Sequence, residues 1–374
     1  MKIALLTQGF RTFAPEASNI TLMILAEELS KKGHEVIIFC NQILKQPLIE
    51  KINGYKVVRQ KSDYNSRYKS AMQLLNFSKM IKKEVEQSGK EFDVIHNFSA
   101  SPILAIRAVL AKKHSKNAKL IQTIRARTNF YLSYLLTPLL NKFDFVVVPT
   151  NSLRKTLIRF GLNPIKIKLI SSYIDINKFK PRDKNALKRK YRLNNKKILL
   201  YYGHMSESKG IYNLIDAIEL IKDEDFIALF ITGSGENFIQ PYERAVRKKN
   251  LQNKIKIIKT PVKKTRNIEE YVAMADAVVL PYPNLISTEA QPSCVIESMA
   301  SKTQLITTDI KELKELVSGY AILAKPCNTE SLAAKIKEFL RNGPDKRMIE
   351  KAHKKALEFD YRRVIGRYLD IYSE

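Results

Sequence analysis

Short apolar runs alternate along the chain with segments in which apolar residues recur at helical spacing. The first run, residues 3–7, is followed by such a segment at residues 18–32, which Gly33 ends before the next apolar run at residues 36–40. Continuous apolar strands joined by helices are typical of parallel sheets that are covered on both faces. The pattern therefore predicts an α/β fold.

The alternation of strands and helices occurs twice. Strands are predicted at residues 3–7, 36–40, 93–96, 119–124, 145–148, 166–171, 198–202, 226–232, 255–259, 277–281 and 304–308. Helices are predicted near residues 18–32, 67–88, 101–114, 129–142, 151–160, 209–222, 238–249, 267–275, 293–301 and 310–317.

The join between the two series, at residues 172–193, contains Pro181 and a basic run. We expect two tandem Rossmann-like, doubly wound parallel-sheet domains, residues 1–174 and residues 175–355, with an interdomain cleft. Residues 356–374 are expected to form a C-terminal helix that packs back on the N-terminal domain. In such sheets, ligands bind outside the carboxyl ends of the strands.

Composition narrows the class of protein. The chain has 374 residues and is 45% apolar, which suits two folded domains and excludes global disorder. Three scattered cysteines indicate a reducing, cytoplasmic compartment and argue against a disulfide framework or a zinc site. The apolar run at the N-terminus is too short for the core of a signal peptide. Residues 130–149 contain charges and Pro138, so they predict a buried helix and a strand, not a membrane span.

The net charge is strongly positive, at +28. Such a field attracts nucleic acid, an anionic membrane or phosphorylated substrates, although lysine-rich solvated helices would give the same value. One alternative is therefore a basic nucleic-acid-binding protein. The absence of a known nucleic-acid-binding motif and of a basic strand with interleaved aromatic residues argues against it.

Two glutamates eight positions apart carry the first candidate site. Glu289 follows a loop rich in Pro, Asn and Ser, and Glu297 falls in the first turns of a helix that Pro292–Ser293 is expected to begin. The amides of Ser293, Cys294 and Val295 are expected to be free to bind an anion. Two acceptors for sugar hydroxyls beside an anion site would suit a nucleotide sugar, whereas an isolated pair would be two solvated acids.

Two loops that follow predicted strands add cationic and glycine positions. In the first, Lys209 precedes Gly210 at a helix start, where a cation can meet a phosphate, and His204 is a second donor. In the second, Gly233 and Gly235 permit close approach of a ligand, but they do not complete the motif of a nicotinamide dinucleotide site. The carboxylates at 223–225 match D-x-D but are expected to form a solvated turn, so no metal is expected.

These motifs, in this order, resemble the C-terminal half of the retaining glycosyltransferases of family 4, also called group 1, which have the GT-B fold. Further segments of the chain are similar to that family: 29–36, 92–96, Asp175 before 179–181, and 359–361. The resemblance implies a hexosyltransferase-type enzyme that moves a sugar, with retention, from a nucleotide diphosphate sugar to a lipid-linked or polysaccharide acceptor in glycan biosynthesis. It implies no cofactor and no metal.

The resemblance also implies roles for single residues. Lys209 would hold the diphosphate of the donor, Glu297 would bind the ribose, and Glu289 would lie at the transferred sugar. The amides after Ser293 would meet phosphate, and Gly233 and Gly235 would lie near the base. Lys209 and Glu289 are thus the candidate catalytic residues.

The sequence departs from the family pattern at four places: Ala17–Ser18, His204, Arg125 and Ser172–Tyr173. An arginine cannot act as a base, but Arg125 with Arg127 could bind a phosphate on the acceptor. A nucleotide-sugar epimerase on the same scaffold is an alternative, although the sequence does not place the acid–base cluster that it would need.

The predicted helix at residues 67–88 suggests a membrane surface. Its bases flank apolar positions, a pattern typical both of helices that lie on anionic membranes and of helices with a buried face: Arg67, Lys69, Lys79, Lys82 and Lys83 beside Met72, Leu74, Leu75, Phe77, Met80 and Ile81. With the apolar segment 130–140 in the same domain, this pattern predicts peripheral attachment to the inner face of the membrane.

Overall fold

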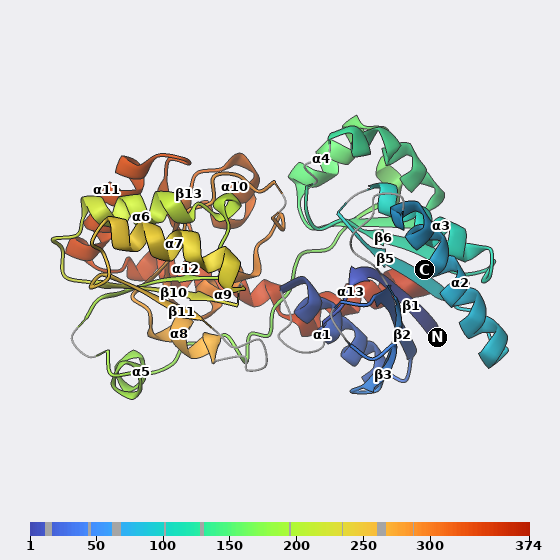
Figure 1. Ribbon diagram of the computed structural model, residues 1–374. Coiled ribbons are helices and arrows are strands. Elements are labelled where there is room, and N and C mark those ends of the chain that lie inside the picture. The colour runs from blue at the N-terminus through green and yellow to red at the C-terminus, as the bar shows by residue number, and fades with distance from the viewer. Residues whose placement is uncertain are drawn as a thin grey trace. The chain divides into compact units, whose positions relative to one another are not determined.

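The computed structural model describes residues 1–11, 17–43, 46–61, 69–100, 102–127, 131–193, 196–233, 235–259, 267–286 and 288–374. The chain forms two compact units (Figure 1). Unit 1 comprises Met1–Ser172 together with Arg362–Glu374, and unit 2 comprises Tyr173–Tyr361. Arg67 and Phe130, which the membrane prediction includes, lie outside the described residues.

Unit 1 contains an eight-stranded sheet in the order β3-β4-β2-β1-β5-β6-β7-β8. Its strands are β1 (Lys2–Gly9), β2 (Glu35–Asn41), β3 (Ile49–Ile52), β4 (Tyr55–Gln60), β5 (Val94–Phe98), β6 (Lys119–Thr123), β7 (Phe145–Val148) and β8 (Ile167–Leu169). All neighbouring pairs are parallel except β3 and β4, which form a hairpin. Asn53 and Gly54 connect them, and both have the positive φ that a tight hairpin turn requires.

The helices of unit 1 cover its sheet. They are α1 (Ala17–Lys31), α2 (Lys69–Ser88), α3 (Ile106–Lys112), α4 (Asn151–Arg159) and α13 (Tyr361–Ser373), with 3-10 helices η1 (Pro102–Ala105), η2 (Tyr131–Lys142) and η3 (Pro164–Lys166). The helix expected at residues 129–142 is a 3-10 helix at Tyr131–Lys142, and Pro138 within it lacks an amide donor.

Helix α13 packs on the sheet of unit 1, where it contacts a buried histidine. The Nδ1 atom of His96 lies 2.6 Å from the hydroxyl of Tyr372, and its Nε2 atom lies 2.7 Å from Oγ1 of Thr123. Burial lowers the pKa of His96 to about 3, so the imidazole is neutral. The last helix therefore completes the core of the unit that the chain builds first.

Unit 2 contains a six-stranded, all-parallel sheet in the order β11-β10-β9-β12-β13-β14. Its strands are β9 (Ile198–Tyr202), β10 (Ile227–Thr232), β11 (Ile255–Lys259), β12 (Ala277–Leu280), β13 (Gln304–Thr308) and β14 (Ile322–Ala324). Every residue of β9, β10, β12 and β13 is buried, as expected for central strands with helices on both faces.

Helices cover both faces of the second sheet. They are α5 (Lys184–Lys190), α6 (Ile211–Leu220), α7 (Glu236–Lys248), α8 (Ile268–Met274), α9 (Ser293–Ala300), α10 (Lys311–Val317), α11 (Thr329–Asn342) and α12 (Lys346–Ala356), with 3-10 helices η4 (Glu207–Lys209) and η5 (Leu357–Phe359). In Figure 1, α6, α7 and α11 lie on one face, and α8 lies on the other.

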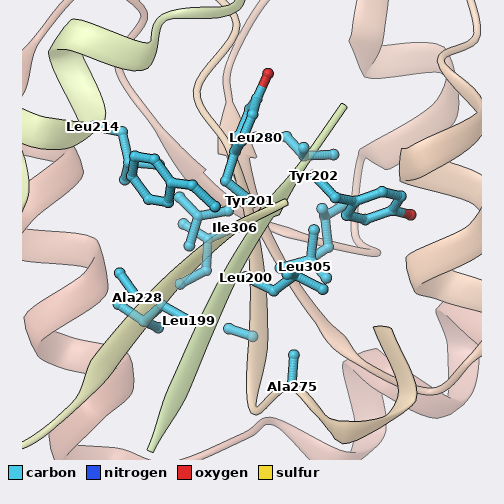
Figure 2. Packing of buried hydrophobic residues seen from close by; sticks show 14 of the residues in the cluster. Leu199, Leu200, Tyr201, Tyr202, Leu214, Ala228, Ala275, Leu280, Leu305 and Ile306 are labelled. Atoms are coloured by element: carbon cyan, nitrogen blue, oxygen red, sulfur yellow. The ribbon is translucent and has the colours of Figure 1, made fainter. Parts of the chain in front are cut away.

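The first residues of β9 pack in the core, and the last two place hydroxyl groups at the end of the strand. Leu199 and Leu200 pack among the buried side chains of β10, β12 and β13. Figure 2 shows the rings of Tyr201 and Tyr202 pointing in different directions, as the alternation of side chains along a strand requires. Both rings are buried, but each hydroxyl is hydrogen-bonded at the carboxyl end of the strand. This end of the sheet is where the candidate site lies.

Candidate functional site

The order of the strands in unit 2 marks a position for a ligand. The chain runs outward from β9 through β10 to β11 and then returns to place β12 on the other side of β9. The loops that leave the carboxyl ends of β9 and β12 therefore lead to strands on opposite sides of this central pair. In open α/β sheets such a switch in strand order is the usual ligand site. All donor-side residues predicted from the sequence lie on loops or helix starts at this edge.

The two loops meet at a glycine. Gly210 has φ +74°, and a Cβ atom added there would lie 2.0 Å from the carbonyl oxygen of Pro281, which follows β12. No other residue type fits without a backbone shift. The contact fixes the end of η4 against the second loop and so positions Lys209, the residue before Gly210.

The ammonium group of Lys209 is largely buried between these loops. Its Nζ atom donates to Oγ1 of Thr288 at 2.8 Å and lies 5.3 Å from the centre of the Tyr282 ring. Among the described residues, no carboxylate forms an ion pair with it. Burial lowers the pKa of Lys209, and the nearby charge of Glu289 acts in the opposite direction. A largely buried ammonium whose direct contacts are a hydroxyl and a ring can still bind an anion.

Helix α9 begins where the sequence predicted, but its start differs in detail. Pro292 is the N-cap residue, and no side chain caps the helix, so Ser293 is the first helical residue and not the cap. The amide of Val295 donates to the carbonyl of Pro292 at 3.1 Å. The expectation that this amide is free is therefore wrong, because the first turn closes on itself.

Glu297 lies on the first turns of α9 in a shell of hydroxyl groups. The hydroxyl of Tyr202 is 2.9 Å from its Oε2 atom and 3.0 Å from the carbonyl oxygen of Cys294. Burial raises the pKa of Glu297 to about 7, and hydrogen bonds from Tyr202 and Ser293 act in the opposite direction. The side chain therefore exists in both protonation states near neutral pH.

Cys294 lies beside the same residues. Its Sγ atom is 3.0 Å from the hydroxyl of Tyr282, and burial raises the pKa of the thiol to about 11. The thiol is therefore protonated at neutral pH and acts as a packing and hydrogen-bonding group. Tyr202, Tyr282 and Thr288 were not predicted from the sequence, since a tyrosine at the end of an apolar strand has the same pattern as a core residue.

The glycine loop after β10 is exposed. Gly235 is the N-cap of α7, its φ is −64°, and an added Cβ would meet only Cδ2 of Phe238, at 3.9 Å. Neither the backbone conformation nor the surrounding space requires a glycine at this position. Gly233 and His204 are also exposed. His204 belongs to the loop after β9. Its carbonyl accepts a hydrogen bond from Tyr201 at 2.7 Å, which fixes that loop to β9.

Arg125 and Arg127 belong to unit 1, and so to a different unit from the donor-side residues. They follow β6, and a terminal nitrogen of Arg127 donates to Ser152 at 3.0 Å and to Thr156 at 3.4 Å, both in α4. Arg125 acts on Tyr368 of α13, where its charge opposes the rise in pKa that burial causes. Arg127 thus also ties α4 to β6, a structural role that the sequence did not indicate.

The D-x-D segment forms ion pairs, as expected for a solvated turn. Asp225 contacts Lys196 at 2.7 Å, and Glu224 contacts Lys337 at 3.1 Å and Arg341 at 3.4 Å. In the described ranges, no group of three or more His, Cys, Asp or Glu residues has a metal-binding arrangement. None of the helices described is both long and apolar enough to cross a membrane.

Two family models match the chain. Glycosyltransferase Family 4 matches residues 19–178, and Glycosyl transferases group 1 matches residues 183–356. Together they span the chain except for 18 residues at each end and four residues between the matches. The chain belongs to this glycosyltransferase family. The resemblance inferred from the glutamate pair and its neighbours is confirmed, and neither the nucleic-acid-binding nor the epimerase alternative is favoured.

Individual relatives of this glycosyltransferase are distant. It is 22% identical over 193 residues to the phosphatidylinositol N-acetylglucosaminyltransferase GPI3 subunit of Saccharomyces cerevisiae, a match that covers 51% of this chain and 41% of the yeast protein. The chain therefore spans less than half of the length of that relative.

Solved structures show the fold over the whole chain. A glycosyltransferase from Rickettsia africae has a TM-score of 0.78 at 22% identity, with 99% of this chain and 97% of that chain covered. HepE from Anabaena, in complex with UDP and glucose, has a TM-score of 0.78 at 15% identity, with 100% and 99% covered. The glycosyltransferase thus has the GT-B fold of two Rossmann-like domains.

Proposed function

We propose that this glycosyltransferase transfers a sugar from a nucleotide diphosphate sugar to an acceptor, with retention at the anomeric carbon. The observation that supports this proposal most is the largely buried ammonium of Lys209, held by Thr288 at the strand-order switch of unit 2. A diphosphate would give this cation a directly contacting anion, which it does not have among the described residues. HepE, a structural neighbour, is in complex with UDP and glucose, which agrees with a donor of this class.

We propose for the site residues the roles that the family resemblance implies. Lys209 binds the diphosphate and stabilises the charge on the leaving phosphate, while Glu297 accepts hydrogen bonds from the ribose hydroxyls. Glu289 lies at the transferred sugar, where negative charge favours a transition state with oxocarbenium character. His204 and the amides of Ser293 and Cys294 are further donors to phosphate, and Gly233 and Gly235 leave room for the nucleoside.

Donor binding tests this proposal directly. Lys209→Ala and Glu297→Ala each remove a charge-assisted contact, so calorimetry with a nucleotide sugar should show affinity about 10- to 100-fold lower. Lys222→Ala, at an exposed lysine of the same unit, is the matched control and should bind like the wild type. Glu289→Gln should lower turnover and keep donor affinity. Wild-type donor affinity in both alanine variants would overturn the assignment.

We further propose that the reaction is independent of a divalent metal. Lys209 and the start of α9 supply the positive charge that a metal would supply on the diphosphate. In the D-x-D segment Asp225 is paired with Lys196, and Glu224 is paired with Lys337, which makes these two carboxylates poor candidates for metal ligands. Activity should persist in excess chelator, and complete loss of activity that magnesium reverses would refute this part of the proposal.

The proposed acceptor is a lipid-linked or growing polysaccharide at the cytoplasmic face of a membrane. Phe77 and Ile81 of α2 are buried, so the apolar face of this helix packs in the core of unit 1. Lys79, Lys82 and Lys83 are exposed together with Leu75, which is 49% exposed. We propose that this face of α2 binds anionic lipid by charge, with the exposed Leu135 and Leu136 of η2 as apolar contacts.

Sedimentation with anionic vesicles tests the membrane proposal. Each lysine near such a surface contributes about 1 kcal/mol, so binding should fall sharply with salt. A triple variant, Lys79→Glu, Lys82→Glu and Lys83→Glu, should stay in the supernatant. The matched control carries the same charge change at exposed lysines of unit 2, at positions 248, 346 and 351. If the wild type also stays in the supernatant at low salt, a soluble acceptor becomes the better proposal.

A further inference from the structure

One aromatic side chain is left in solvent next to the glycine loop. Phe238 is 58% exposed, and among the described residues it is the only exposed phenylalanine. It lies in the first turn of α7, where its amide donates to the carbonyl of Gly235 at 3.0 Å. The turn therefore holds this ring at the carboxyl end of β10, one strand away from β9, whose loop carries Lys209.

The ring is braced from the neighbouring loop. The imidazole of His204 lies 5.5 Å from the phenyl ring, centre to centre, at an angle of 59°. The backbone of His204 is in turn held by Tyr201, which is buried in the sheet. Phe238 is thus positioned from two loops, although more than half of it stays accessible. A fixed, exposed aromatic ring beside exposed glycines is suited to stacking against a flat group.

We infer that Phe238, braced by His204, is the stacking platform for the base of the donor nucleotide. The inference rests on the proposed function, since it assumes that the diphosphate lies at Lys209. It adds a residue for the nucleoside, for which the sequence motifs offered only space at Gly233 and Gly235. Because every base has a flat face, stacking of this kind tolerates different bases. We therefore expect Phe238 to contribute to affinity for uridine and guanosine diphosphates alike.

The chain offers a direct optical test, because it contains no tryptophan. Phe238→Trp introduces a single indole at the platform and keeps an aromatic face. Titration with UDP or GDP should quench its fluorescence, whereas inorganic pyrophosphate, which has no base, should leave it unchanged. Quenching by pyrophosphate to the same extent, or no response to a nucleotide that the variant binds, would overturn the inference.

Affinity measurements give the second readout. Phe238→Ala should bind UDP and GDP about 5- to 150-fold more weakly than the wild type, since stacking on one aromatic residue supports a loss of that size. Its affinity for pyrophosphate should not change. Phe238→Trp should restore nucleotide binding. Leu220→Ala is the matched control, because Leu220 is 56% exposed and lies at the end of α6, away from the loops that follow β9 and β10. This variant should bind nucleotides like the wild type.

The outcomes separate this inference from the function on which it rests. If the wild type binds nucleoside diphosphates and Phe238→Ala binds them equally well, the platform is wrong and the proposed function stands. If Phe238→Ala loses pyrophosphate and nucleotide binding to the same degree, the platform is also wrong, because the base makes no separate contribution. If the wild type binds no nucleoside diphosphate, the proposed function itself fails.

Discussion

The carboxyl group of Glu297 should make the protein less stable as the pH rises, and Glu297→Gln should remove that effect. Burial raises its pKa from an ordinary value of 4.5 to about 7, so the folded state binds a proton more tightly than the unfolded state. The favourable contribution of the protonated group is complete below the unfolded pKa. It is lost as the pH rises through about 7, where the buried group must ionise.

The size of the effect follows from the shift. A change of one pKa unit corresponds to about 1.4 kcal/mol, so this shift makes ionised Glu297 cost about 3 kcal/mol of unfolding free energy at pH 8. At pH 5 the same calculation gives less than about 1 kcal/mol. These are upper bounds, because Glu297 is intermediate in exposure. Glu297→Gln keeps the shape without the charge, so it should stabilise the protein at pH 8 and change little at pH 5.

Urea unfolding of the wild type and Glu297→Gln at both pH values measures this difference. Comparing the two proteins cancels all groups that titrate equally in both. Glu330→Gln, at an exposed glutamate of α11, carries the same chemical change at the surface and is the matched control. An equal stability difference between the wild type and Glu297→Gln at pH 5 and pH 8 would show that the carboxyl group is not desolvated as the structure indicates.

Three further predictions concern the candidate site and the cysteines of both units. In calorimetric titrations, the affinity of the wild type for a nucleotide should rise with pH through about 7 as Glu297 ionises. Tyr202→Phe lacks a hydrogen bond to the carboxylate, so the pKa of Glu297 should be higher in this variant and the rise in affinity should occur at higher pH. Gly210→Ala should lower the free energy of unfolding by more than about 1 kcal/mol in urea titrations and weaken nucleotide binding, because φ is +74° and Pro281 leaves no room for a Cβ atom. An unchanged free energy of unfolding and unchanged nucleotide affinity would contradict this contact. Iodoacetamide should label exposed Cys327 in the native protein and buried Cys40 only after unfolding, as mass spectrometry can check. Cys294 is partly buried, and burial raises the pKa of its thiol to about 11 and that of Cys40 to about 12, so Cys294 should also react slowly in the native protein.

The alternation of apolar runs predicted the architecture, because a strand that helices cover on both faces has few positions for polar side chains. Strand β9 illustrates this, with five buried residues. The hairpin β3–β4 was not predicted, since Ile49–Ile52 has only four residues and its two isoleucines flank a charged pair instead of alternating with polar residues. The pair Asn53–Gly54 was the available signal, as it supplies the two positive φ angles of a tight turn.

The site was predicted in part for a related reason. Lys209, Glu289 and Glu297 stand out in the sequence because charges beside buried strands need a partner. Tyr202 does not, since its ring is buried like its neighbours and only the hydroxyl at its tip reaches Glu297. Thr288 binds Lys209 across 79 positions of sequence, a pairing that depends on the order of the strands. Whether the amide of Val295 is free depends on how the first turn of α9 closes, which the sequence does not show.

The return of Arg362–Glu374 to unit 1 has a consequence for biosynthesis. Unit 1 lacks its last helix until about 190 more residues, those of unit 2, have been translated. At roughly 5–20 residues per second, this takes on the order of 10–40 seconds. During that time the face of the sheet that carries His96 and Thr123 has no Tyr372 to cover it. In the nascent first domain the imidazole of His96 therefore lacks its partner on α13 until the end of the chain has been made.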